Sequence, residues 1–198
     1  MYITVTHYKG GVGKTTTAVH LAAYLQQQAP TLFIDGDPVR SATKWAAKGK
    51  GMPFAIVDRE EGDYHARNYT HVVKDTEARP GMADFEKLAR GCDLLVIPTM
   101  PFDMESEALK ETMRALQHIS TSNRYRVLLT MVPPPPEDEA AELRQKLSHA
   151  KIPLFKAEIP YLKCFKKAAA QGVPVYEVHD RRAARAWGAY EAAGKEIL

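Results

Sequence analysis

The sequence predicts an α/β fold in which helices cover both faces of a mostly parallel, twisted sheet. Two observations carry this prediction. Short apolar runs of strand length alternate with longer amphipathic segments along the chain, which is typical of parallel sheets with helical crossovers. A glycine-rich turn also follows the first apolar run and precedes the first amphipathic segment. That order is a strand–turn–helix unit.

The expected strands are short apolar runs bounded by turn residues. They are Tyr2–Thr6, Thr31–Ile34, Phe54–Val57, His71–Lys74, Asp93–Ile97, Arg126–Thr130 and Leu154–Ala157. The expected helices are longer and carry apolar residues at helical spacing. They are Lys14–Gln28, Ser41–Lys48, Ala83–Arg90, Met104–Ile119 (with Leu109, Met113, Leu116 and Ile119 on one face), Glu137–Ala150, Cys164–Gln171 and Arg181–Leu198.

Length and composition limit the class of protein. A chain of 198 residues suits one domain over residues 1–198. Its apolar runs are too short to cross a bilayer, and no signal-like stretch opens the sequence. Cys92 and Cys164 are isolated, so neither a disulfide framework nor a cysteine-rich metal site is indicated. A cytoplasmic location is therefore expected.

The glycines of the first turn predict a phosphate site. Gly10, Gly11 and Gly13 lie between an expected strand and an expected helix, which is the context of a P-loop. Their backbone can turn tightly and direct N–H groups at phosphate oxygens, and the positive end of the helix dipole favours the same anion. Lys14 is then expected to contact the β- and γ-phosphates and Thr15 to reach Mg²⁺. The alternative is a glycine turn without a ligand.

The spacing around this turn resembles a known family. KGGVGKTT at residues 9–16 resembles the deviant Walker A box of the ParA/MinD ATPases. IDGDP at 34–38, with Ser41 beyond it, looks like the box after the second strand, and HVVKDT at 71–76 looks like the Walker B strand. IPY at 159–161 and AAAQGVPV at 168–175 resemble the C-terminal segment of ParA-type partition proteins. The resemblance implies a P-loop NTPase fold.

It also implies roles for single residues. Lys9 looks like the signature lysine that crosses to the partner's nucleotide in ATP-bound dimers, and Asp37 resembles the carboxylate that positions the attacking water. Lys9, Lys14 and Asp37 are thus the catalytic candidates. Asp35 and Asp75, both acting through water, and Thr15 would hold Mg²⁺. For each acid the alternative is a loop-capping aspartate, and Asp37 before Pro38 could simply start a turn.

The nucleotide itself, expected to be ATP, would be bound by the loop and by the end of the sixth strand. The candidate residues are Gly10, Gly11, Val12, Gly13, Lys14, Thr15, Thr16, Met131 and Pro133. Relatives often place an adenine-reading asparagine after the sixth strand, where this chain has TMVP at residues 130–133. Base recognition is therefore expected from backbone groups near Pro133–Pro136.

Two further residues depart from the family pattern. Lys74 stands where a buried strand ordinarily carries an aliphatic side chain. Either that end of the strand is wet or Lys74 pairs with a neighbouring acid. Arg79 is expected to be a solvated loop residue, and reach toward the nucleotide or a dimer partner is the alternative.

The resemblance implies an ATP-dependent homodimer that binds non-specific DNA on the nucleoid and is stimulated by a ParB-like or other small adaptor. Its cargo would be a plasmid, a chromosome locus or a protein organelle such as a carboxysome. Basic residues near the C-terminus are the DNA-binding candidates: Lys163, Lys166, Lys167, Arg181, Arg182 and Arg185. The alternative for them is a solvated helix face.

Two rival functions stay open at this point. A MinD-like regulator would need a membrane helix, but the apolar stripe of Ala183, Trp187, Tyr190, Gly194 and Ile197 is expected to dock on the core. The other rival is an ATP-dependent metabolic P-loop enzyme.

The histidines lack metal-ligand spacing and are expected at the surface or as caps. His7 and Tyr8 are expected either to line a dimer contact or to end the first strand.

Overall fold

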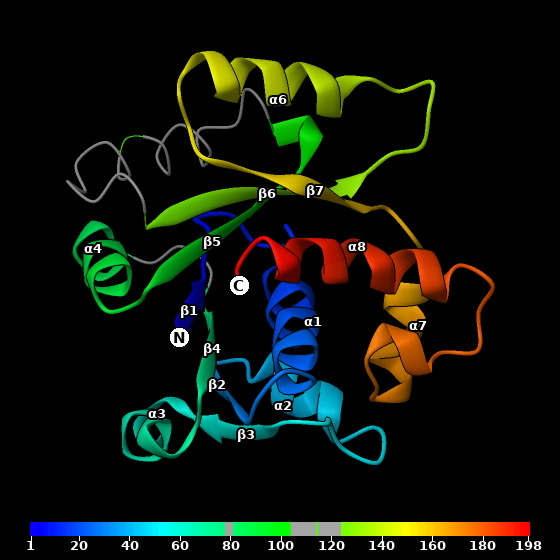
Figure 1. The fold of residues 1–198 in the computed structure, drawn as a ribbon. Coiled ribbons are helices and arrows are strands. Elements are labelled where there is room, and N and C mark those ends of the chain that lie inside the picture. Colours follow the sequence, from blue (N-terminus) through cyan, green and yellow to red (C-terminus); the bar gives the residue numbers. More distant parts are fainter. Residues whose placement is uncertain (78–80, 104–113, 115–123) are drawn as a thin grey trace.

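A seven-stranded sheet, with every neighbouring pair parallel, forms the centre of the part of the chain that the structure describes (Figure 1). The computed structural model describes residues 1–77, 81–103, 114 and 124–198. The strand order is β3-β2-β4-β1-β5-β6-β7. The strands are β1 (Tyr2–Val5), β2 (Thr31–Gly36), β3 (Ala55–Asp58), β4 (His71–Thr76), β5 (Leu94–Thr99), β6 (Tyr125–Val132) and β7 (Leu154–Pro160).

Helices cover both faces of this sheet, as predicted (Figure 1). One face carries α1 (Lys14–Gln26), α2 (Ser41–Ala46), α7 (Cys164–Gln171) and α8 (Ala183–Lys195). The other carries α3 (Arg59–His65), α4 (Met82–Arg90) and α6 (Glu139–His149). Short 3₁₀ turns lie at η1 (Ala66–Asn68), η2 (Pro101–Asp103) and η3 (Val175–Glu177).

All seven predicted strands are confirmed, and most of the predicted helices are too. The helix expected over residues 104–119 falls almost entirely outside the described residues. The C-terminal helix docks as expected, because its apolar stripe is buried against α1 and β7. None of the helices in the described ranges is long and apolar enough to span a bilayer.

One helix, α3, was missed. It begins because the carboxylate of Asp58 accepts the backbone N–H groups of Glu60 and Glu61, at 3.1 and 2.9 Å. The helix also needs Gly62, since a Cβ atom there would lie 2.7 Å from the side chain of Ile34 on β2. A cap with two acidic residues in the first turn is the sequence signal for this helix.

At the other end of the sheet, Glu196, the C-cap residue of α8, bonds to the edge strand β7. The carboxylate of Glu196 accepts the N–H groups of Lys156 and Ala157, both at 2.8 Å, and the Glu196 carbonyl accepts a bond from Arg126. The β6–β7 register shifts in this stretch, between Val127 and Leu129, so the side chain satisfies backbone donors where the strand pairing is irregular.

His20 is buried in the core between α1 and η3, and the prediction of a surface or capping histidine was wrong for it. Its Nε2 accepts the N–H of Val175 at 3.0 Å, so the ring proton lies on Nδ1 and is donated to the Thr16 carbonyl at 2.6 Å. The ring stacks on Tyr190. Burial lowers the pKa of His20 to about 4.

The buried His20 predicts a pH-dependent stability. Its folded pKa near 4 lies below its ordinary value of 6.5, so the unfolded chain binds the extra proton first. The stabilising contribution of neutral His20 is therefore fully present above pH 6.5. As the pH falls from 6.5 toward 4, the free energy of unfolding decreases by up to about 1.4 kcal/mol per pH unit. Urea denaturation at pH 7, 6 and 5 measures this slope.

A His20→Gln variant is the control, because it removes the titrating ring and leaves every other ionisable group, including the buried His71, in place. The slope should be shallower in the variant than in the wild type. Equal slopes in the two proteins would contradict the assignment to His20.

Candidate functional site

The glycine turn forms a cradle at the N-terminus of α1. Gly11 and Gly13 have φ angles of +80° and +87°, in the left-handed region that L side chains rarely adopt. Gly13 is the N-cap residue, and its carbonyl accepts the Thr17 N–H at 2.8 Å. The open N–H groups of the first turn and the helix dipole make this point a site for an anion.

Lys14 begins the helix with a mostly buried side chain, and its ammonium donates to the Lys9 carbonyl at 3.3 Å. Burial lowers the pKa of Lys14, and the nearby carboxylates of Asp75 and Asp37 oppose that shift. The two carboxylates favour the charged form of this buried lysine, and the Lys14 ammonium can bind a further anionic group.

The next residue, Thr15, joins α1 to the end of β4. Its hydroxyl donates to Oδ2 of Asp75 at 2.6 Å. The Asp75 carboxyl is fully buried, and burial raises its pKa to about 7, while the Thr15 bond and the charge of Lys14 act in the opposite direction. A cation close to Asp75 would favour its charged form.

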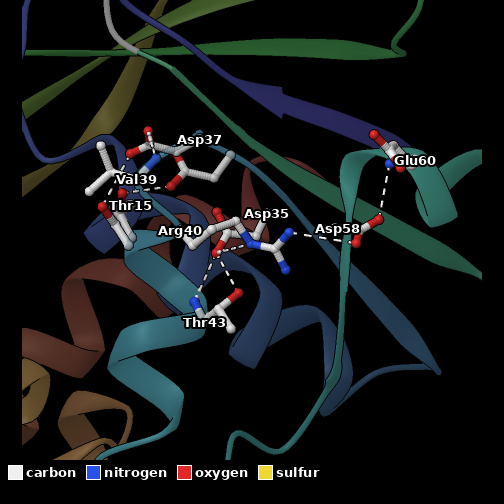
Figure 2. Close-up of polar contacts among 10 residues, drawn as sticks. Thr15, Asp35, Asp37, Val39, Arg40, Thr43, Asp58 and Glu60 are labelled. Carbon is white, nitrogen blue, oxygen red and sulfur yellow. Dashed lines mark hydrogen bonds and ion pairs between the residues drawn. The ribbon is translucent and has the colours of Figure 1, made fainter.

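Asp35, at the end of β2, is buried beside Asp75 and hydrogen-bonded to α2 (Figure 2). Its Oδ2 accepts the backbone N–H and the hydroxyl of Thr43, at 2.8 and 2.6 Å. Its Oδ1 is buried and makes no hydrogen bond to any described residue. An orphaned carboxylate oxygen at the end of a parallel strand fits a hydrated cation.

Asp37 shapes the loop between β2 and α2. Its two oxygens accept the Val39 N–H at 3.0 Å and the Ser41 hydroxyl at 3.1 Å (Figure 2). The turn-forming contacts weighed as an alternative for Asp37 are therefore present. Each oxygen keeps a further lone pair, so these contacts leave acceptor capacity toward the loop's open side.

An open cleft of about 550 Å³ brings most of the candidate residues together. Its walls are Gly10, Gly11, Gly13, Lys14, Thr15, Thr16, Asp37, Pro38, Val39, Ser41, Glu77 and Met131. Asp35 and Asp75 are buried at the strand ends close by. Val12 is also buried, and its carbonyl accepts the Thr130 hydroxyl at 2.9 Å, a contact that the sequence reasoning missed. Lys9 and Pro133 do not line the cleft.

A smaller apolar pocket of about 150 Å³ adjoins the cleft at Met131 and Gly13. Pro160 at the end of β7, and Tyr161 and Leu162 in the connection to α7, contribute to its wall. Met131 has a left-handed φ of +53°. The sequence reasoning had singled out Met131 for the nucleotide but had assigned no such role to Tyr161 or Leu162.

Lys74 lies on the opposite face of the sheet from Asp75. It is half-buried and lines a separate cavity of about 270 Å³, together with Arg59, Glu77 and Asp84 among others. That end of the strand is therefore reached by solvent, which was one of the two explanations for a lysine there. Arg79 lies outside the described residues.

The basic C-terminal candidates gather on α7, on α8 and on the segments before them, and all six are exposed. These residues are Lys163, Lys166, Lys167, Arg181, Arg182 and Arg185. Helices α7 and α8 pack on each other and on η3. One of the six, Lys167, forms an ion pair with Asp180.

His7 and Tyr8 are buried, and Tyr8 stacks on Phe85, so both are packed at the end of the first strand.

Comparison with known proteins agrees with this geometry. The family model described as "CobQ/CobB/MinD/ParA nucleotide binding domain" matches residues 3–175. The maintenance of carboxysome distribution protein A of Gloeobacter kilaueensis is 35% identical over 98% of this chain and 93% of its own length.

Two solved structures have the same fold at low sequence identity. A plasmid partition protein of Borrelia burgdorferi bound to AMPPNP has a TM-score of 0.72 at 16% identity, covering 99% of each chain. MinD in the MinC:MinD complex of Aquifex aeolicus has a TM-score of 0.73 at 16% identity, covering all of this chain and 96% of its own. The chain therefore belongs to the CobQ/CobB/MinD/ParA family of nucleotide-binding domains, and the predicted resemblance to ParA/MinD proteins is confirmed.

Proposed function

We propose that this protein is a ParA-type ATPase that binds Mg²⁺·ATP, dimerises around it and positions a cargo on nucleoid DNA in the cytoplasm. The observation that carries the proposal is the cleft at the start of α1, where the glycine cradle, the buried Lys14 and the Thr15–Asp75 hydrogen bond meet Asp37. In the proposed complex the α1 N-terminus and Lys14 bind the phosphates of ATP.

The residues fit a magnesium ion. Thr15 supplies a hydroxyl, Asp75 a buried carboxyl and Asp35 an orphaned oxygen, and these are the hard oxygen donors that Mg²⁺ takes, directly or through water. When bound, the ion neutralises charge on the phosphates and withdraws electrons from the bond that breaks. Asp37 is proposed to orient the attacking water with the acceptor capacity that its loop contacts leave.

The adenine is proposed to lie in the apolar pocket beside Met131, with backbone groups toward Pro133 completing the contacts. Its flat apolar surface suits a wall of Pro160, Tyr161 and Leu162. No asparagine side chain is needed in this arrangement, which accounts for Met131 at that position.

Lys9 is proposed to act on the nucleotide of a second copy. The Lys9 carbonyl accepts a hydrogen bond from Lys14, and the Lys9 side chain does not line the cleft of its own chain. Its ammonium would therefore reach the nucleotide that the second copy holds in a dimer.

The similarity to a carboxysome-distribution protein supports a protein organelle as cargo, recognised through a small adaptor. The MinD-like membrane alternative is disfavoured, because the apolar stripe of α8 is packed on α1.

The first test is dimer formation by an Asp37→Ala variant. Without the water-orienting carboxylate, hydrolysis should stop and the ATP-bound dimer should accumulate. Size-exclusion chromatography with light scattering, in Mg²⁺·ATP, measures the mass. The wild type in Mg²⁺·ADP is the control and should stay monomeric. A variant that remains monomeric in ATP would count against the sandwich dimer.

The second test separates the two lysines of the loop. Lys9→Ala should bind ATP nearly as well as the wild type, but its turnover should fall about 100-fold, as when one charge-stabilising group is removed from a transition state. Lys14→Ala is the matched control and should lose nucleotide binding itself. Unchanged turnover in Lys9→Ala would remove Lys9 from the mechanism.

The third test concerns DNA. Random-sequence DNA should bind only with Mg²⁺·ATP, and the salt dependence should weaken by about one unit of slope for each basic side chain that no longer neutralises a phosphate. The triple variant Arg181→Ala, Arg182→Ala, Arg185→Ala is compared with Lys146→Ala on α6, which lies on the other face of the sheet. Equal binding by both, measured by fluorescence anisotropy, would place the DNA surface elsewhere.

A further inference from the structure

Arg40, in the loop after Asp37, has an unfavourable backbone conformation. Its φ is +57° and it is the N-cap residue of α2. Its N–H donates to the Asp37 carbonyl at 2.8 Å, and its carbonyl accepts from Lys44 at 2.9 Å. A left-handed conformation is less favourable for arginine than for glycine, because arginine carries a Cβ atom. None of these backbone contacts requires an arginine side chain.

The side chain lies between two carboxylates (Figure 2). Its Nε is 3.8 Å from Oδ2 of Asp35, and its Nη1 is 3.6 Å from Oδ2 of Asp58. Both distances are ion-pair distances and are too long for hydrogen bonds. The guanidinium is therefore shared between the two acids without being hydrogen-bonded to either.

Strand register explains this position. Asp58, Asp35 and Asp75 are neighbours in register on β3, β2 and β4, so three acids lie in a row at the ends of adjacent strands. Lys14 is the cation near Asp75. Arg40 is the cation at the other end of the row, next to Asp35 and Asp58.

The orientation of Asp35 does not depend on Arg40. Two hydrogen bonds from Thr43, at 2.8 and 2.6 Å, already fix its Oδ2, and they are much shorter than the contact to Arg40. Arg40 therefore acts on Asp35 mainly through its charge. A positive charge beside a carboxylate makes that carboxylate a weaker partner for any other cation.

We propose that Arg40 is an internal cation that competes with the nucleotide's magnesium ion for Asp35, and that Asp58 restrains it by drawing the guanidinium toward β3. This inference rests on the proposed function, in which Asp35 faces the water shell of the metal. Arg40 is then an affinity-setting residue. It keeps the acidic row neutralised when no nucleotide is bound and raises the Mg²⁺ concentration needed to load the site.

Competition predicts opposite effects for its two partners. Removing Arg40 frees Asp35, so less Mg²⁺ is needed. Removing the charge of Asp58 leaves Arg40 with Asp35 alone, so more Mg²⁺ is needed. A merely structural role for this ion-pair network would move both variants in the same direction, because both would loosen the same loop.

The experiment titrates Mg²⁺ against a fluorescent, non-hydrolysable ATP analogue and measures the half-saturating Mg²⁺ concentration. Arg40→Gln should lower it about fivefold, and Asp58→Asn should raise it by a smaller factor, as expected for one charge at partly solvated distance. Asparagine keeps the helix cap of α3, so the Asp58 variant changes charge and little else.

Arg40→Gly is the backbone control. It removes the left-handed strain that glutamine retains, so its melting temperature should be at least that of Arg40→Gln, while both should shift the Mg²⁺ midpoint alike. The inference is overturned if the Arg40 and Asp58 variants shift in the same direction or if neither shifts. Wild-type protein that binds the analogue without any dependence on Mg²⁺ would instead overturn the proposed function.

Discussion

The crowding of three carboxyl groups at neighbouring strand ends, with Asp35 and Asp75 buried, is the constraint on which the rest of the site depends. Parallel register places Asp58, Asp35 and Asp75 side by side, and buried acids are unfavourable unless hydrogen bonds or cations compensate them. Each compensating group belongs to a different element. Thr15 and Lys14 bring α1 to Asp75, Thr43 brings α2 to Asp35, and the N–H groups of α3 serve Asp58. Helices α1 and α2, which bear the site, are thus held by Asp75 and Asp35, the two carboxyl groups that suit a metal ion.

The helix α2 carries this arrangement beyond the cleft. Its first turn is bonded to Asp35, and its Trp45 donates to the Val173 carbonyl at 3.1 Å, just after α7. His20 forms a second link, from the Thr16 carbonyl at the start of α1 to the Val175 N–H. Two short series of hydrogen bonds therefore connect the C-terminal basic elements to the cleft. In the proposed function, such links would be the physical route by which nucleotide binding alters the basic surface.

Much of this molecule could be predicted from its sequence. The strands follow from local apolar runs, and the glycine cradle before α1 follows from glycine spacing. Helix α3 was missed because its residues show no apolar periodicity, and it depends on a cap and on close packing of Gly62 against Ile34. The proposed role of Arg40 could not be predicted from the sequence either, because the alignment of Asp58 with Asp35 is a property of strand register. No local pattern encodes which residue of β3 lies beside which residue of β2.

The Glu196 carboxylate on the β7 edge has a consequence for self-association. A protein that collects at high local density on a scaffold, as proposed, risks growing into fibres if its sheets join edge to edge. The pairing of β7 is irregular where Glu196 binds the Lys156 and Ala157 N–H groups, and an irregular edge strand offers a poorer template to another copy. The proposed dimer would then form through other faces, where assembly can end at a closed pair and be reversed.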